Sequence, residues 1–300
     1  MAGQERVIGV DLGGTKILAG VVGRDGAVER RREWPTPVDS LESLLAGLDE
    51  AVEDLLGDGI AALGFGLPSR VDQRTGRAFG SVNIPLEDVD FRDRMQDRFG
   101  LPVGVENDAN AATFAEWRCG AGREARNLAM LTLGTGVGAG FVLDGRLYRG
   151  WAEAGHMVVV HDGKPCRGAC SGRGHLEAYC TGLAADEAAR DEFGPAADSH
   201  RLVRLANEGD ERARDVLAGI ARILGSGIGS LVNLFDAERV VIGGGFGAAA
   251  FDHLVSPALE IARREALSPA DEALEIVKAE LATAAGLIGA GLVAFEALDP

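Results

Sequence analysis

Residues 7–22 read Val-Ile-Gly-Val-Asp-Leu-Gly-Gly-Thr-Lys-Ile-Leu-Ala-Gly-Val-Val, and this stretch decides how the rest of the chain is interpreted. An apolar run that carries one acid, Asp11, is interrupted by four small or polar residues and then resumes. The interrupting residues are Gly13, Gly14, Thr15 and Lys16. The pattern predicts two strands joined by a tight turn.

A turn of this composition is suited to binding a phosphate group. Glycines let the backbone NH groups point at an anion, and the Thr15 hydroxyl and the Lys16 ammonium would stand beside it. Asp11, at the end of the first strand, suits a water-mediated contact with Mg²⁺. An ordinary hairpin between two core strands is the alternative at this point.

The composition limits the classes of protein to consider. A chain of 300 residues with 46% hydrophobic content can form one large or two medium domains. Its 30 basic and 46 acidic residues give a net charge of -16, so we expect no nucleic-acid partner. The start of the chain has no signal-peptide pattern, and the apolar stretch at residues 281–295 is short for a membrane span. We expect a soluble, cytoplasmic protein without a membrane partner.

The layout of the first stretch recurs later in the chain. An apolar strand at residues 128–133 ends at Gly134, Thr135 and Gly136, resumes at residues 141–143 and turns at an Asp-Gly pair. Residues 134–139 also match the spacing G-x-G-x-x-A, but apolar strand formers follow in place of the helix that a dinucleotide site needs. We therefore expect a second phosphate-binding turn. Two such halves could hold the two ends of a polyphosphate.

Asp108 stands between a short predicted strand, residues 103–105, and an alanine-rich predicted helix. An aspartate before a helix is commonly its N-cap. Phosphoryl transfer, however, needs one carboxylate to accept a hydroxyl proton, and an acid between two phosphate-binding turns meets that need. Asp108 is therefore the candidate general base.

Two cysteines and two histidines lie within twenty residues of one another. They are His156, Cys166, Cys170 and His175. This set predicts a closed, structural Cys2His2 zinc site, with a local disulfide or two unligated thiols as the alternatives. If His156 binds zinc through one ring nitrogen, the other can donate to a ligand hydroxyl, with Glu153 and Glu177 on either side of the loop.

The remaining chain is predicted to be mainly helical, with further buried strands. Residues 41–56, 91–99, 183–235 and 251–266 read as helices, and the strand at residues 240–242 ends in glycines. Gly244 and Gly245 could lie close to an adenosine, or they could only tighten helix packing.

These motifs together resemble the ROK family of sugar kinases and sugar-sensing repressors, within the actin-like ATPase superfamily, over essentially the whole chain. The resemblance implies two actin-like (ribonuclease H-like) α/β domains with a cleft between them, residues 1–108 plus 284–300 and residues 109–283. It implies Mg-ATP and a hexose as substrates, structural zinc, and a dimer or tetramer. Asp108 resembles the catalytic base. The residues that resemble sugar ligands are Asn83, Asn107, Asp108, Glu153, His156 and Glu177.

The resemblance thus implies phosphorylation of a hexose primary hydroxyl, with glucose expected. A kinase for N-acetylmannosamine or fructose, a polyphosphate donor and a non-catalytic sugar sensor are the alternatives. Repressors of the family carry a helix-turn-helix segment before the first strand, and six residues precede Val7 here, so we expect an enzyme. The zinc loop departs from the usual pattern through His175, and Ser69 and Arg70 replace a Gly-x pair at the expected sugar cleft.

Overall fold

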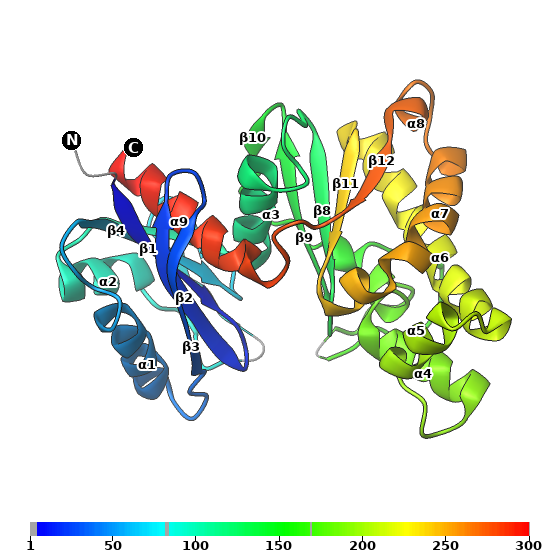
Figure 1. Cartoon of the computed structure of the whole chain (residues 1–300), viewed down its shortest axis with the longest axis horizontal. Coiled ribbons are helices and arrows are strands. Elements are labelled where there is room, and N and C mark those ends of the chain that lie inside the picture. The colour runs from blue at the N-terminus through cyan, green and yellow to red at the C-terminus, as the bar shows by residue number, and fades with distance from the viewer. Residues whose placement is uncertain (1–4, 82–83, 169, 300) are drawn as a thin grey trace. The chain divides into compact units, whose positions relative to one another are not determined.

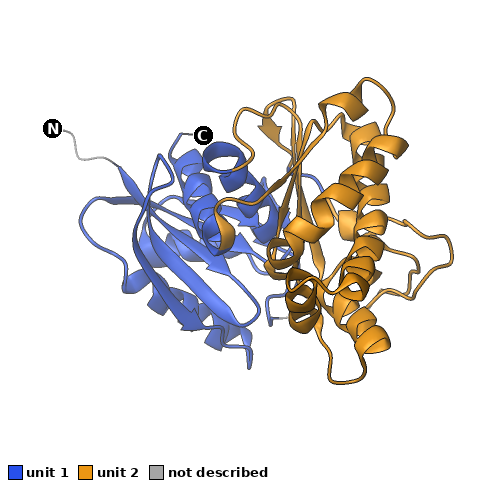
Figure 2. Ribbon diagram, turned by 45° about the vertical axis from the view of Figure 1, so that its right-hand side comes forward, with its two compact units in different colours: residues 1–120, 149–151, 283–300 blue, residues 121–148, 152–282 orange. Residues whose placement is uncertain are grey.

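The computed structural model describes residues 5–81, 84–168 and 170–299. The chain forms two compact units, which Figure 2 colours separately. Unit 1 comprises residues 1–120, 149–151 and 283–300, and unit 2 comprises residues 121–148 and 152–282. Each unit is an α/β structure around one five-stranded sheet (Figure 1).

The sheet of unit 1 has the strand order β3-β2-β1-β4-β7. The strands are β1 (Arg6–Leu12), β2 (Lys16–Gly23), β3 (Val28–Pro35), β4 (Ile60–Leu67) and β7 (Val103–Asn107). Strands β1, β2 and β3 are antiparallel, whereas β4 pairs in parallel with β1 and β7. A small hairpin, β5 (Val71–Asp72) and β6 (Arg77–Ala78), lies outside this sheet.

Helices cover both faces of this sheet. The amphipathic α1 (Leu41–Glu53), capped by Ser40, packs on one face together with α2 (Phe91–Phe99). The opposite face carries the C-terminal helix α9 (Ala285–Leu298), which also packs against α3 (Asp108–Cys119). A short 3₁₀ turn, Ala282–Ala284, precedes α9.

A row of glycines allows α9 to lie directly on the strands. Gly20, Gly9, Gly64 and Gly104 are neighbours in register across four strands. A Cβ atom at Gly64 would overlap the carbonyl oxygen of Ala290 in α9, and those at Gly9 and Gly104 would overlap other α9 carbonyls. Side chains in this row would therefore hold the helix away from the sheet.

The sheet of unit 2 has the order β10-β9-β8-β11-β12. The strands are β8 (Leu128–Leu133), β9 (Val137–Leu143), β10 (Arg146–Leu147), β11 (Arg239–Gly243) and β12 (Glu275–Lys278). Strand β9 begins four residues earlier than predicted. Gly138 and Gly140 suggested a loop, but both are paired with β8, and this pairing outweighs the low strand propensity of glycine.

The helices of unit 2 are α4 (Gly182–Phe193), α5 (Ser199–Asn207), α6 (Glu211–Phe235), α7 (Gly245–Glu265) and the short α8 (Ala270–Ala273). Helix α7 begins six residues before its predicted start, immediately after the glycines that follow β11. Among the described helices, α6 alone is long and apolar enough to cross a membrane, but 56% of its apolar window is buried inside the protein. It packs closely on α7, since a Cβ atom at Gly229 would meet the side chain of Glu265 at 2.8 Å.

The compact units differ in their bounds from the expected domains, 1–108 plus 284–300 and 109–283. Helix α3 groups with unit 1 because it packs on α9, where Gly289 leaves room for the backbone of Ala111. Residues 149–151 also group with unit 1, although unit 2 precedes and follows them in the chain.

Candidate active site

The first glycine turn joins β1 to β2 in unit 1, as predicted. The NH of Gly13 donates to the carbonyl of Lys16 at 2.9 Å. Thr36, which is 8% exposed, holds the turn from β3, because its hydroxyl donates to the Gly13 carbonyl and its NH donates to that of Thr15. The ammonium of Lys16 pairs with Glu33 at 2.9 Å. Thr36 was missed because nothing in its local sequence indicates a contact with the turn.

Asp11 lies near the end of β1, where two glycines leave room for its carboxylate. A Cβ atom at Gly286 would overlap the Asp11 carboxylate, and one at Gly66 would stand 3.9 Å from it. Burial, and then repulsion from Asp108, raise the pKa of Asp11 from 3.8 to about 7, and the Lys16 charge opposes these effects. A cation beside the carboxylate would favour its ionised form.

Asn107 and Asp108 occupy the junction between β7 and α3. The N-cap of α3 is Asn107, whose side-chain oxygen accepts from the NH groups of Ala109 and Asn110. The Asp108 carboxylate accepts from the Asn107 side chain at 3.0 Å and from the Ala109 NH at 2.8 Å. Asp108 is therefore held in place without being the cap residue. The positive end of the α3 dipole also favours an acid here.

The second glycine turn joins β8 to β9 in unit 2. The NH of Gly134 donates to the carbonyl of Gly136 at 3.0 Å, and the NH of Gly182, at the start of α4, donates to the Gly134 carbonyl. Thr135, between the two glycines, is exposed. The strand that follows the turn confirms that residues 134–139 are not a strand-to-helix dinucleotide motif.

Gly244 brings a second helix N-terminus to this turn. It has φ +79° and precedes α7, and a Cβ atom on it would stand 2.6 Å from the backbone of Leu133. Nothing lies within 4 Å of a Cβ atom at Gly245. The backbone NH groups of two helix N-termini and a glycine turn gather here, which is an arrangement that favours anions.

The four predicted metal ligands come together in unit 2. One donor atom from each of His156, Cys166, Cys170 and His175 lies within 4.8 Å of the others, and the structure has all four cysteines of the chain as free thiols. The two histidine Nδ1 atoms are 3.2 Å apart. The Nδ1–Sγ distances are 3.7 Å for His156 with Cys166 and 3.6 Å for His175 with Cys170.

These distances fit a tetrahedral zinc site. Zinc bonds of about 2.0 Å to nitrogen and about 2.3 Å to sulfur place two nitrogens about 3.3 Å apart, and nitrogen and sulfur about 3.5 Å apart. Burial, together with Cys170 and Glu177, raises the pKa of the Cys166 thiol, and a bound cation would reverse that effect. Because both rings present Nδ1, each Nε2 would remain available as a donor.

Glu177 connects this cluster with the second turn. One carboxylate oxygen accepts from the NH of Val137 at 3.0 Å, and the other lies 4.0 Å from the Cys166 sulfur. A Cβ atom at Gly136 would stand 2.7 Å from the first oxygen. Glu153 precedes the 3₁₀ turn Ala154–His156, His156 is its last residue, and both are exposed.

The proposed sugar ligands thus form one group in each unit. Unit 1 carries Asn107 and Asp108, and unit 2 carries Glu153, His156 and Glu177. Asn83 lies outside the described residues. Sequence reasoning also missed Glu106, a nearly inaccessible acid beside Asn107, and Arg149, its ion-pair partner.

Known proteins are similar to this chain over nearly its whole length. The sequence profile of the ROK family matches residues 7–297. A glucokinase of Streptomyces coelicolor is 32% identical over 96% of this chain and 97% of that protein. An N-acetylmannosamine kinase of Shigella flexneri is 30% identical over 96% of this chain and 98% of that protein.

Two solved structures are also similar to this chain. The ROK family glucokinase from Streptomyces griseus, in complex with glucose and AMPPNP, is 32% identical with a TM-score of 0.81 and covers 97% of this chain and 99% of its own. The ROK hexokinase from Thermus thermophilus is 36% identical with a TM-score of 0.83, over 98% and 99% of the chains. The expected α/β fold with two actin-like domains is thereby confirmed.

Proposed function

This chain belongs to the ROK family, and from that premise we propose that it is a sugar kinase that transfers the γ-phosphoryl group of Mg-ATP to the primary hydroxyl of glucose. The observation that carries the proposal is the placement of Asp108. It begins α3 after a capping asparagine, and its charge repels that of Asp11. The full-length similarity to a glucokinase, and to a glucokinase structure that binds glucose and AMPPNP, supports glucose and ATP as substrates.

The residues of unit 1 would accept the hydroxyl proton and bind Mg²⁺. Asp108 would accept the hydroxyl proton as the sugar oxygen attacks phosphorus, while Asn107 would bind a neighbouring hydroxyl. Asp11 would hold Mg²⁺ through water, and the ion would bring this carboxylate into its ionised form. Gly13, Gly14, Thr15 and Lys16 would contact the transferred phosphate.

The residues of unit 2 would hold the nucleotide and the rest of the sugar. The turn at Gly134, Thr135 and Gly136 offers backbone NH groups to phosphates. Gly244 and Gly245 would lie against the adenosine, with open space beside Gly245. We assign structural zinc to His156, Cys166, Cys170 and His175, a closed set without an open position for catalysis. The bound ion would fix His156, whose Nε2 would donate to a sugar hydroxyl, with Glu153 and Glu177 as acceptors.

N-acetylmannosamine is the second candidate substrate, because a kinase for that sugar is 30% identical to this chain. One feature of unit 1 bears on the choice. The Arg70 guanidinium stacks between the rings of Phe79 and Trp151, each 4.9 Å away, and the preceding Ser69 carbonyl accepts from Asn107. Arg70 therefore stands close to the proposed sugar ligands and would influence which substituent fits.

The test is ADP release from Mg-ATP with glucose, mannose, fructose, N-acetylglucosamine and N-acetylmannosamine. We expect turnover on glucose, and a loss of at least about 1,000-fold in Asp108→Asn, because the amide cannot accept the proton. Asp39→Asn, at an exposed acid before α1, is the matched control and should stay within twofold of the unchanged protein. Turnover on another sugar would change the substrate only. Sugar binding without any turnover would contradict the proposed activity and favour a sensor.

A further inference from the structure

Glu106 is a buried carboxylate immediately before Asn107 and Asp108. Its side chain is 2% exposed. One oxygen accepts from the Gln73 amide at 3.1 Å, the Asn107 NH at 2.9 Å and the Asn110 amide at 3.1 Å. The other accepts from the Nε of Arg149 at 2.8 Å. A carboxylate without access to water needs these donors, since burial of an unpaired charge is costly.

Arg149 reaches Glu106 from a distant part of the sequence. It follows β10, a strand of unit 2, but groups with unit 1. Its guanidinium also pairs with Glu296 of α9, so one planar fork joins acids on β7 and α9. Among the residues that the structure describes, Arg149 is the one ion-pair partner of Glu106.

The same segment reaches Asn107 by a second route. Trp151, two residues after Arg149, stacks on Arg70, and the carbonyl of the neighbouring Ser69 accepts from the Asn107 side chain at 3.3 Å. The backbone NH of Asn107 thus donates to Glu106, which pairs with Arg149. The Asn107 side chain donates to Ser69, next to Arg70, on which Trp151 stacks. Both ends of residues 149–151 are anchored next to the residue that caps α3.

We propose that Arg149 is a positioning residue for the phosphoryl-transfer step, acting through Glu106 on Asn107 and Asp108. The inference rests on the proposed function. Without the guanidinium, the Glu106 carboxylate must move toward water or toward another donor, and its bonds to the Asn107 NH and the Asn110 amide are lost or weakened. A base displaced by about 1 Å loses about 100-fold in rate.

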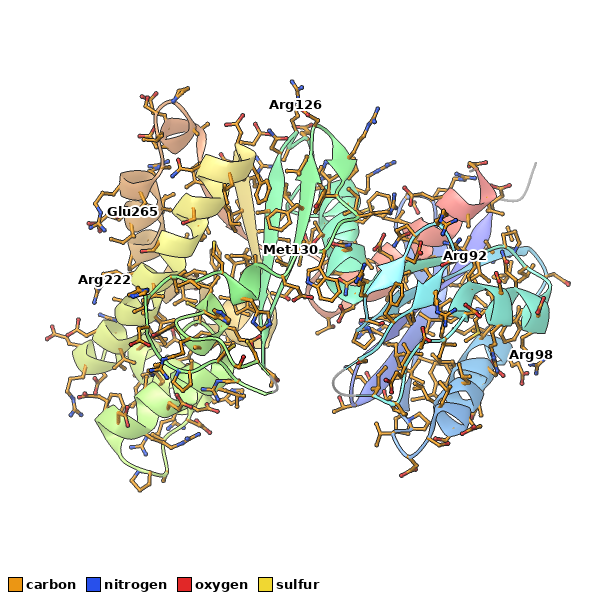
Figure 3. All side chains as sticks on the ribbon, turned by 180° about the vertical axis from the view of Figure 1, so that it is seen from behind. Arg92, Arg98, Arg126, Met130, Arg222 and Glu265 are labelled. Carbon is orange, nitrogen blue, oxygen red and sulfur yellow. The ribbon has the colours of Figure 1, made fainter. Side chains whose placement is uncertain are left out.

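The experiment compares Arg149→Gln and Arg149→Lys with the unchanged protein. Lysine keeps the charge but cannot contact two separated acids as a fork does. Arg126→Gln is the matched control, because Arg126, labelled in Figure 3, pairs with Asp144 at 2.8 Å on an exposed surface of unit 2. For each variant, kcat, both KM values, the stoichiometry of glucose binding and Tm are measured.

We expect Arg149→Gln to bind one equivalent of glucose with kcat reduced about 10- to 100-fold. The KM for Mg-ATP should stay within twofold, since neither Arg149 nor Glu106 is among the proposed nucleotide contacts. Arg149→Lys should fall between Arg149→Gln and the unchanged protein, and Arg126→Gln should match the unchanged protein. A kcat within twofold of the unchanged protein in Arg149→Gln would overturn the proposal. The proposal would also be overturned if kcat fell only in proportion to a smaller fraction of protein that binds glucose.

A double variant tests the route through Glu106. If Arg149 acts through this acid, Arg149→Gln combined with Glu106→Gln should be no slower than the slower single variant. If the two rate losses multiply, the residues act separately and the proposal fails. Absence of turnover in the unchanged protein would instead contradict the proposed sugar kinase, so the two failures are distinguishable.

Discussion

The two sheets of the molecule share one topology but carry different chemistry. In each, three antiparallel strands are followed by two parallel ones, and a glycine turn follows the central strand, β1 or β8. Two residues before the first glycine of the turn stands Asp11 in unit 1 and Thr132 in unit 2. The same backbone position is thus an acid with a raised pKa in one unit and a neutral hydroxyl in the other.

The turns themselves differ in length and in what holds them. The first has four residues between paired strand ends and is held by Thr36, whereas the second has three and is held by Gly182 and Glu177. We infer that unit 1 provides the groups for proton transfer and Mg²⁺, and unit 2 the backbone NH groups for the nucleotide.

The sheets also differ at the row of residues that faces α9 in unit 1. The glycine row Gly20, Gly9, Gly64 and Gly104 in unit 1 corresponds to Gly140, Met130, Val241 and Val277 in unit 2. Figure 3 marks Met130 on its strand. Side chains occupy three of these four positions in unit 2, whereas in unit 1 the α9 backbone lies against the glycines.

The largest expected effect is on the glycine row. Gly64→Ala should lower the free energy of unfolding by about 4 kcal/mol or more, because its Cβ atom would overlap the Ala290 carbonyl and push α9 off the sheet. Gly80→Ala, where nothing lies within 4 Å of the added atom, should change it by less than about 0.5 kcal/mol. Urea unfolding followed by circular dichroism measures both, and equal effects would contradict the close packing of α9.

The next effect tests the acid that distinguishes the two turns. Asp11→Asn should reduce kcat/KM for Mg-ATP about 100- to 1,000-fold, since the amide provides no charge for the ion. Thr132→Val, at the corresponding position of unit 2, should lose less than about threefold because no ionised group is removed. Steady-state kinetics over a range of Mg²⁺ concentrations measures the difference. Similar losses in both variants would contradict the assignment of the metal to unit 1.

Loss of the cluster formed by His156, Cys166, Cys170 and His175 should have a smaller effect, confined to unit 2. Mass spectrometry of the native protein should find one zinc ion, and Cys166→Ser should lose it with a decrease of about 3 kcal/mol in unfolding free energy. Cys119→Ser, outside the cluster, should keep the ion. A native protein without zinc, or Cys166→Ser that retains it fully, would show that these four residues do not form the site.

The smallest effect concerns the pH dependence of stability without Mg²⁺. The pKa of Asp11 rises from 3.8 to about 7 on folding, so the folded state binds the proton more tightly and stability falls as pH increases through that window. The free energy of unfolding of Asp11→Asn should therefore exceed that of the unchanged protein by about 1–3 kcal/mol at pH 8 in EDTA and match it near pH 4. Asp39→Asn should show no such trend. An Asp11→Asn gain of equal size at both pH values would contradict the raised pKa.

Local patterns predicted the parts of the site that depend on neighbouring residues. The turn after β1, the repeated layout at β8 and the Cys/His cluster all depend on residues close in sequence, and the structure brings each of them together. The ion pair between Glu106 and Arg149 spans 43 positions, and no periodicity marks either member. The glycine row was likewise invisible, because its members are separated along the chain and meet only through strand register.

Two errors in the elements have the same origin. Gly138 and Gly140 read as a loop but belong to β9, and Gly245 and Gly247, which precede the predicted helix start at residue 251, belong to α7. At these positions tertiary contacts outweigh the low propensity of glycine for regular structure. The sequence offered Asp108 as a possible N-cap of α3, as the alternative to a general base, whereas the structure assigns the cap to Asn107.

We propose that Asp108 and Asp11 of unit 1 promote transfer of a phosphoryl group from Mg-ATP to a sugar. The most direct measurement is ³¹P NMR of the products formed from Mg-ATP and glucose by the unchanged protein and by Asp108→Asn. We predict one equivalent of glucose 6-phosphate for each ADP with the unchanged protein, and neither product with Asp108→Asn. Release of ADP with inorganic phosphate and no sugar phosphate, or equal sugar phosphate from both proteins, would contradict the account.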